Sequence, residues 1–127
     1  MNRRLEVVVV DDEQQITDLF KTFLFLADQE ISVHTFNDSI AAKDFIAKNP
    51  VDVLITDLNM PLFSGLNLME SAPKETRKIL MSGYVGDIPQ VKLRELNATF
   101  FEKPVPLAEV IQIVSEQKKL RLQTKPG

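Results

Sequence analysis

Residues 5–12 read Leu-Glu-Val-Val-Val-Val-Asp-Asp and carry the strongest structural signal in the chain. An unbroken run of β-branched side chains is typical of a strand that is buried on both faces. Such strands belong to parallel sheets whose two faces are covered by helices. The two aspartates follow the run at once, so we predict that they lie where this strand ends.

Short apolar runs and helical patterns alternate along the rest of the chain. Further strands are predicted at residues 32–36, 51–56, 77–81 and 99–102. Helices are predicted after residue 38, over 66–71, over about 87–96 and from 106 onward. A further helix is predicted between the first two strands. It has six apolar residues on one face, which we expect to pack on the core: Ile16, Leu19, Phe20, Phe23, Leu24 and Ala27. The second, capped by Asp38 or Ser39, has four: Ile40, Ala41, Phe45 and Ile46.

Five consecutive strand–helix units predict a parallel sheet with helices on both faces. We therefore expect an α/β fold, a flavodoxin-like (βα)5 three-layer sandwich with a five-stranded sheet in the order 2-1-3-4-5. The domain is expected to span residues 1–117. Residues 118–127 are mostly polar, and we expect a C-terminal tail that could link the domain to an output domain outside this sequence.

The composition excludes several classes of function. A chain of 127 residues buries one hydrophobic core, which rules out a multidomain machine. The lack of cysteine excludes disulfide bonds, a thiolate zinc site and a cysteine nucleophile, and it favours a reducing, cytoplasmic location. The first apolar run is too short for a signal peptide or a membrane span. A net charge of −3 without a basic stripe argues against direct binding of nucleic acid.

The residues that follow each strand are the candidates for chemistry, because open parallel sheets bind ligands at the carboxyl ends of their strands. Four of the five predicted strands are followed by suitable side chains, whereas the second contributes nothing obvious. The candidates are Asp11, Asp12, Asp57, Ser82 and Lys103. We expect them to form one site.

Three of these candidates are carboxylates, which the expected strand order brings together because it makes the first and third strands neighbours. Converging carboxylates repel one another, and without a cation the pKa of at least one would rise. Mg²⁺ prefers oxygen ligands, and with the Lys103 ammonium it would balance the three negative charges. The sequence therefore predicts a Mg²⁺ site that can also receive a phosphoryl group.

Four short motifs connect the chain to a known family. They are Asp11-Asp12, Asp57-Leu-Asn-Met-Pro61 followed by Gly65, Ser82-Gly83 and Lys103-Pro104. Each motif is weak alone, but all four in this order at strand ends form a strong signal. From about residue 5 to residue 117, the chain resembles a response-regulator receiver domain of two-component signalling.

This resemblance implies a phosphorylation-activated signalling switch. Asp57 would accept a phosphoryl group from a phosphohistidine of a sensor histidine kinase or a histidine phosphotransfer protein. Lys103 and Ser82 would contact the phosphoryl oxygens, and the Lys103–Pro104 peptide bond would be cis. The chain would catalyse only its own phosphorylation and dephosphorylation, so it would not be a metabolic enzyme.

The resemblance also implies the ligands of the metal. Mg²⁺ would be held by Asp57, directly by Asp12, largely through water by Asp11, and by the backbone carbonyl of Asn59. Asn59 and Tyr84 occupy positions that tune dephosphorylation in the family. The lifetime of the phosphoryl group is therefore expected to depend on these two side chains.

Ser82 and Phe100 occupy the switch positions of the domains that this chain resembles. On phosphorylation Ser82 would move toward the phosphoryl group and Phe100 would swing inward. This would change the face made by the fourth helix, the fifth strand and the fifth helix, which a downstream effector domain or protein would read. Because Phe100 stands in place of the more usual tyrosine, no phenolic hydrogen bond can report the state.

Two other interpretations stay open. A small Mg²⁺-dependent phosphatase of the haloacid dehalogenase type would use Asp11 as its nucleophile and Glu13 as the acid partner, although the chain has no room for a cap domain. A degenerate receiver would be a constitutive binding module that does not need phosphorylation. Turnover of a phosphate ester through Asp11, or partner binding without Asp57, would distinguish them.

Protein partners are expected rather than a membrane or nucleic acid. A homodimer could form through Ile113 and Leu120, which lie seven residues apart in the last helix, although two residues do not make a coiled coil. His34 is the single histidine, and we expect a surface or half-buried side chain without partners.

Overall fold

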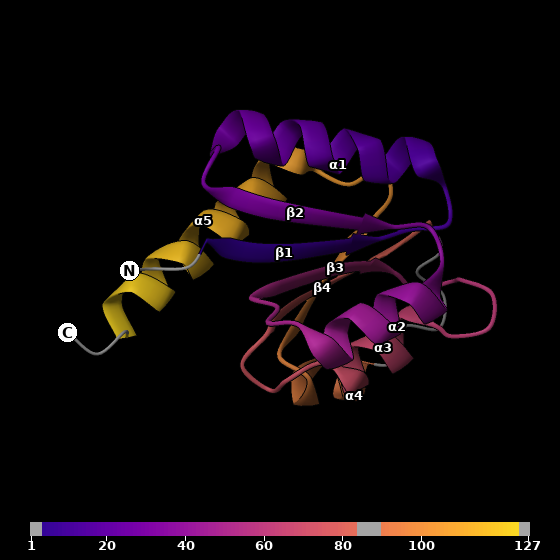
Figure 1. Ribbon diagram of the computed structural model, residues 1–127. Coiled ribbons are helices and arrows are strands. Elements are labelled where there is room, and N and C mark those ends of the chain that lie inside the picture. The colour runs from indigo at the N-terminus through magenta and orange to yellow at the C-terminus, as the bar shows by residue number, and fades with distance from the viewer. Residues whose placement is uncertain (1–3, 84–89, 125–127) are drawn as a thin grey trace.

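The computed structural model describes residues 4–83 and 90–124. Within them, five strands alternate with five helices (Figure 1). The strands are β1 (Leu5–Val10), β2 (Ile31–Phe36), β3 (Val53–Asp57), β4 (Arg77–Ser82) and β5 (Ala98–Glu102). The helices are α1 (Gln14–Ala27), α2 (Ser39–Lys48), α3 (Gly65–Ser71), α4 (Gln90–Glu95) and α5 (Leu107–Thr124). None of these helices is long and apolar enough to span a membrane.

The strands form one parallel sheet in the order β2-β1-β3-β4-β5, which confirms the expected topology. Helices α1 and α5 lie on one face of this sheet, and α2, α3 and α4 lie on the other (Figure 1). Val10 of β1 pairs with Thr56 of β3, so the residues that follow them lie side by side at the carboxyl edge of the sheet. The strand order thus determines where the site forms.

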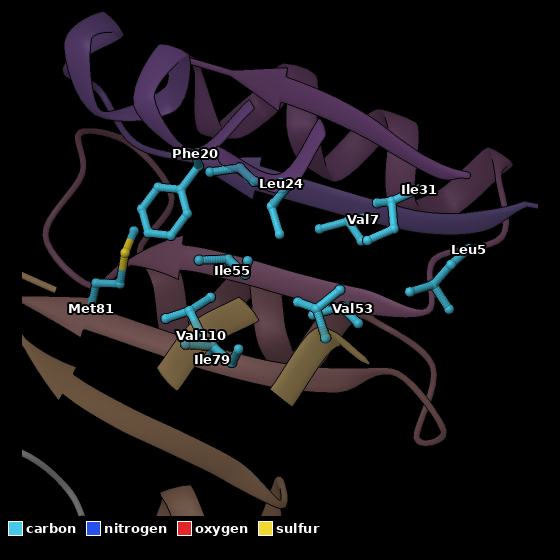
Figure 2. Close-up of a cluster of buried hydrophobic side chains, with 12 residues drawn as sticks. Leu5, Val7, Phe20, Leu24, Ile31, Val53, Ile55, Ile79, Met81 and Val110 are labelled. Atoms are coloured by element: carbon cyan, nitrogen blue, oxygen red, sulfur yellow. The ribbon is translucent and has the colours of Figure 1, made fainter. Parts of the chain in front are cut away.

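The core has two halves, because successive side chains of a strand point to opposite faces of the sheet. Val7 and Val9 of β1 belong to the half beneath α1 and α5, whereas Val8 and Val10 belong to the half beneath the other three helices. Figure 2 shows Phe20 of α1 pointing toward the first half. The continuous valine run is thus explained by burial on both sides.

The expected core face of α1 is partly wrong. Phe20 and Leu24 are buried, but Leu19 and Phe23 are each 41% exposed. The buried polar residue Thr17 takes a place on the inner face instead. The helix packs mainly on β2 and, to a lesser extent, on α5 and β1, so its contact surface is narrower than the apolar stripe.

The inner face of α2 also differs from the expectation. Asp38 caps the helix, since its side chain accepts a hydrogen bond from the Ile40 N–H at 2.9 Å. Ile40 itself is 45% exposed and Ala41 is exposed, whereas Ala42 and Ile46 are buried. One step of the helix, about 100°, separates the exposed Ala41 from the buried Ala42.

His34 is half-buried as expected, but the prediction that it has no partners is wrong. Its Nε2 atom lies 2.7 Å from Oε1 of Glu6 on the neighbouring strand β1. Its ring also lies against Phe45 of α2, with 4.7 Å between the ring centroids. The sequence could not show these contacts, because they join three different elements.

Helix α5 continues beyond residue 117, so the polar segment that begins at Lys118 is helical as far as Thr124. Lys118 Nζ lies 2.6 Å from Asp28 and 2.9 Å from Glu30, and Arg121 lies 2.9 Å from Asp52. Ile113 packs against the core, whereas Leu120 is exposed. The described part of this segment is therefore held on the domain by ion pairs.

Two glycines near the carboxyl edge of the sheet offer a matched test of packing. A Cβ at Gly65, the first residue of α3, would collide with the carbonyl oxygen of Asp57 and lie 2.9 Å from its carbonyl carbon. A Cβ at Gly83 would meet no atom within 4 Å. Gly65 thus allows α3 to begin directly against the end of β3.

We predict that Gly65→Ala lowers the free energy of unfolding by about 1–3 kcal/mol, because backbone must move to admit the methyl group. Gly83→Ala should change it by less than about 0.5 kcal/mol, the usual range for a surface substitution. Urea denaturation followed by circular dichroism measures both. Equal effects of the two substitutions would contradict the close packing at Gly65.

Candidate functional site

The three aspartates predicted from the strand ends lie together in the structure. Asp11 and Asp12 follow β1, and Asp57 is the last residue of β3. One carboxylate oxygen from each lies within 4.8 Å of the others. Asp11 and Asp57 are buried, whereas Asp12 is exposed. The cluster is therefore open to solvent on the side of Asp12.

Lys103 reaches this cluster from the edge strand β5, which lies two strands away from β3. It follows β5, and its backbone N–H donates to the carbonyl oxygen of Ser82 at 2.8 Å. Its Nζ lies 2.8 Å from Oδ2 of Asp11 and 3.5 Å from Oδ1 of Asp57. The Lys103–Pro104 peptide bond is cis, as the resemblance implied. One ammonium thus contacts two of the three carboxylates.

Asp11 is held on both of its carboxylate oxygens. Oδ2 accepts from Lys103, and Oδ1 accepts from the backbone N–H of Glu13 at 2.9 Å. Glu13 itself is exposed and points no nearer than 4.0 Å to the Lys103 ammonium. Asp11 is also completely buried, which argues against a phosphatase in which Asp11 attacks a substrate from solvent and Glu13 assists.

Asn37 is a site residue that the sequence reasoning missed. It directly follows β2, the strand for which no candidate was found, and its side-chain amide donates to the carbonyl oxygen of Asp11 at 2.8 Å. The same amide donates to the hydroxyl of Thr17 in α1 at 3.1 Å. Asn37 therefore fixes the turn that presents the two aspartates. A search of the strand ends for side-chain amides, besides carboxylates, hydroxyls and ammonium groups, would have found it.

Ser82, the last residue of β4, is fully buried. The side-chain amide of Asn59 donates to its hydroxyl at 3.4 Å. This contact links two residues to which the sequence analysis gave separate roles. Tyr84, which was paired with Asn59 as a determinant of dephosphorylation, lies outside the described residues, as does the predicted start of the fourth helix near residue 87.

Phe100 and Phe101 point to opposite faces of β5, as their alternation predicts. Phe100 is half-buried and packs on the core half beneath α2, α3 and α4, whereas Phe101 packs on the half beneath α1 and α5. Phe100 is paired with Leu80 in the register of β4 and β5. Its partner Leu80 lies two residues before Ser82 on β4, so Phe100 is close to the serine in the sheet.

The electrostatics of the site follow from burial and from crowding of like charges. Burial raises the pKa of Asp57 from 3.8 to about 6, because desolvation outweighs the attraction of Lys103, and the charge of Asp11 acts in the same direction. Burial alone would lower the pKa of Lys103, but its hydrogen bond to Asp11 and the charge of Asp57 raise it. The cluster has more carboxylates than ammonium groups and thus favours the binding of a cation.

A parallel (βα)5 sheet with an acidic cluster and a lysine at its carboxyl edge defines the class of receiver domains. The response regulator receiver domain family matches residues 7–115, and the chain belongs to that family. The match covers β1 from residue 7, the other four strands and the acidic cluster. It therefore includes all the site residues described above.

Individual relatives agree with this assignment. Regulatory protein VanRc of Enterococcus gallinarum is 32% identical over 115 residues, which cover 88% of this chain and 49% of that protein. Protein-glutamate methylesterase/protein-glutamine glutaminase 2 of Pseudomonas aeruginosa is 32% identical over 127 residues, covering 94% of this chain and 36% of that protein. The chain thus spans half or less of the length of these relatives.

A solved structure confirms the fold. The N-terminal domain of an uncharacterized protein from Wolinella succinogenes superposes with a TM-score of 0.83 at 20% identity. The alignment covers 95% of this chain and 99% of that domain. Identity this low shows the fold alone, so the roles of individual residues must be argued from the site itself.

The raised pKa of Asp57 gives a testable pH dependence. A carboxyl with a raised pKa stabilises the folded state fully below its unfolded value of 3.8, and that contribution is lost as the pH rises through about 6. In metal-free protein, we therefore predict that Asp57→Asn raises the melting temperature at pH above about 7. The gain should shrink as the pH falls below about 6.

Thermal unfolding in EDTA across this pH range measures the effect. Asp44→Asn is the matched control, because Asp44 lies on the exposed surface of α2 with Lys48 as its partner. It should produce no comparable gain. A lower melting temperature of Asp57→Asn at neutral pH would show that pairing with Lys103 outweighs the cost of burial.

Proposed function

We propose that this chain is a phosphorylation-activated switch in which Asp57 accepts a phosphoryl group from a phosphohistidine of a partner protein. The observation that carries the proposal is the contact of one ammonium, that of Lys103, with both Asp11 and Asp57 inside a cluster of three carboxylates. Membership of the receiver family agrees with such a switch. The donor would be a sensor histidine kinase or a histidine phosphotransfer protein.

The transfer step uses the Asp57 carboxylate as the nucleophile. One carboxylate oxygen attacks phosphorus, and a P–O bond forms while the P–N bond to the imidazole breaks. The imidazole nitrogen keeps the electron pair of the broken bond, and Asp57 becomes an acyl phosphate. Asp57 itself is buried at the end of β3, so the donor would approach it through the side of the cluster where Asp12 is exposed.

Lys103 and Ser82 are the residues that would receive the transferred group. The Lys103 ammonium lies 3.5 Å from Asp57 and would pair with a phosphoryl oxygen, as charge-assisted hydrogen bonds to phosphate are strong. The Ser82 hydroxyl would donate to a second oxygen. Since Asn59 donates to that hydroxyl, the Asn59 amide would have to yield or follow when Ser82 turns, which gives Asn59 a part in the lifetime of the acyl phosphate.

The donor set of the cluster fits Mg²⁺. Asp11, Asp12 and Asp57 supply carboxylate oxygens, and the backbone carbonyl of Asn59 would add a neutral ligand, which is the chemistry that this ion prefers. When bound, Mg²⁺ would neutralise charge on the phosphoryl oxygens. The exposed Asp12 leaves the cluster accessible for the ion.

The switch would be read on the face made by α4, β5 and α5. Phe100 packs inward on β5 and stands beside the strand that carries Ser82, so movement of the serine would change its packing. Phosphorylation replaces one negative charge on Asp57 by about two and adds acceptor oxygens. A downstream effector domain or protein would recognise the altered face.

The proposal also includes the domain bounds, the location and the output of this switch. We place the receiver at residues 1–117 and regard residues 118–127 as the connection to an output domain. A cytoplasmic location fits a substrate that is a phosphorylated signalling protein. The two longer relatives carry different names, one a regulatory protein and one a methylesterase, so the output of this chain is left open.

We predict that acetyl phosphate with Mg²⁺ adds one phosphoryl group to the chain, measured by intact-protein mass spectrometry or Phos-tag electrophoresis. Asp57→Asn should abolish the modification, because it removes the nucleophile. Asp44→Asn, the exposed control, should be labelled like the wild type. Labelling of Asp57→Asn at the same stoichiometry would refute the assignment, and partner binding that is unchanged in this variant would favour a constitutive binding module.

We predict that Mg²⁺ raises the melting temperature at neutral pH, because binding to the folded state stabilises it by about 1.4 kcal/mol at a tenfold excess over Kd. Asp12→Asn should weaken this response, since it removes a ligand without disturbing the buried pair of Asp11 and Lys103. Asp44→Asn should retain it. A response of the same size in Asp12→Asn would exclude Asp12 as a ligand.

A further inference from the structure

Strand β2 ends the sheet on the side opposite β5, and within the described residues it pairs only with β1. The carbonyl oxygen of Phe36 accepts from Asp11, so the peptide groups of Phe36 point toward β1. Peptide groups alternate in direction along a strand, which turns those of Val33 and Thr35 away from the sheet. These two residues present backbone donors and acceptors at the outer edge.

Within residues 4–83 and 90–124, this edge has none of the features by which sheets usually block further pairing. Residues 31–36 read Ile-Ser-Val-His-Thr-Phe, without a proline or a formally charged side chain. The register of β1 and β2 runs without a bulge from Leu5 opposite Ile31 to Val10 opposite Phe36. Natural edges are usually protected by lysine, proline, a bulge or a covering element, because an open edge is a template for another strand.

An apolar groove of about 440 Å³ runs beside the same edge, between α1 and β2. It is lined by Lys21, Thr22, Phe25, Leu26, Ile31 and Val33. Leu26 is 70% exposed and Phe25 is 52% exposed, so α1 turns large apolar side chains to solvent here. Figure 1 shows α1 lying along β2 at this end of the molecule. Backbone pairing and apolar burial are thus offered by one continuous surface.

We propose that a second copy of this chain pairs with β2, antiparallel and about a two-fold axis at Val33, to make one continuous sheet across two molecules. In this register Val33 faces its own copy and Ile31 faces Thr35, so the Val33 peptide groups bond to those of Val33 in the other copy and the Thr35 N–H bonds to the Ile31 carbonyl. The Ile31 N–H already donates to the Asp28 carbonyl of its own molecule at 3.2 Å and takes no part in the pairing. The grooves beside the two strands then meet, and the apolar residues of α1 cover the junction.

Charge is the reason to assign the occupant as a second copy. In a two-fold pairing, the residues around the axis of one copy lie close to those of the other copy, so formally charged residues of one sign there would repel. Strand β2 has no such residue, and Lys21 alone is charged among the groove residues. The surface is therefore self-complementary, as an interface between identical copies must be.

This interface leaves the candidate phosphorylation site and the proposed readout face free. It involves the β2 edge, whereas α4 and β5 lie at the other end of the sheet. Dimerisation is therefore expected to be the same in the wild type and in Asp57→Asn. If the chain does not dimerise, sedimentation will show it. If the proposed function is wrong, labelling by acetyl phosphate will show that separately.

Sedimentation equilibrium of the full 127-residue chain tests the proposal over the micromolar to millimolar range. We expect a reversible dimer, whose Kd rises about tenfold or more in Thr35→Pro, because proline removes an outward N–H. Thr35→Val keeps that N–H and should leave the Kd unchanged. Circular dichroism verifies that each variant is folded.

Two surface variants test the groove independently of the strand. Leu26→Glu changes an exposed groove residue, and its charge should raise the Kd about tenfold or more. Val91→Glu is the matched control on α4, where the valine is 65% exposed, and it should have no effect. Dissociation by Val91→Glu but not by Leu26→Glu would place the interface on α4 and overturn the proposal.

Hydrogen exchange supplies a direct measurement of the edge. The amides of Val33 and Thr35 should become protected as the protein concentration rises, because they enter hydrogen bonds only in the dimer. A chain that is monomeric at every concentration, with these amides exchanging rapidly, would overturn the assignment to a second copy. An extended segment of another protein would then be the remaining occupant for this edge.

Discussion

Repulsion among three carboxylates is the constraint around which the site is organised. The parallel pairing of β1 and β3 brings Asp11, Asp12 and Asp57 within 4.8 Å of one another, a distance at which like charges repel. One ammonium, that of Lys103, offsets part of this repulsion because it contacts both Asp11 and Asp57. The remaining negative charge makes the cluster suited to a divalent cation and to the phosphoryl chemistry that such a cation supports.

The elements around the cluster hold this unfavourable arrangement in place. Asn37 fixes the turn after β1, and Gly65 lets α3 begin directly against the carbonyl of Asp57. Valine side chains buried on both faces of β1 anchor the strand that presents Asp11. Stability is thus supplied by the apolar sheet and charge is concentrated at its carboxyl edge, which is where open parallel sheets place their ligands.

The sequence predicted the fold well wherever a local pattern controls the outcome. The valine run, the cap at Asp38 and the alternation of Phe100 and Phe101 depend on neighbours in the chain, and all three are confirmed. The prediction of the core face of α1 was partly wrong, because the width of an apolar stripe does not reveal the width of the surface on which the helix packs. Leu19 lies on that stripe and is exposed because α1 packs mainly on the single edge strand β2.

The sequence by itself determined the order of strands and helices and the residues that follow each strand, since burial on two faces requires a recognisable run of apolar side chains. Only the tertiary structure decided which of those residues meet. The contacts of Lys103 with Asp11, of Asn37 with the Asp11 carbonyl and of His34 with Glu6 join segments 92, 26 and 28 residues apart. Such contacts depend on distances across the folded sheet, which no local pattern of side chains encodes.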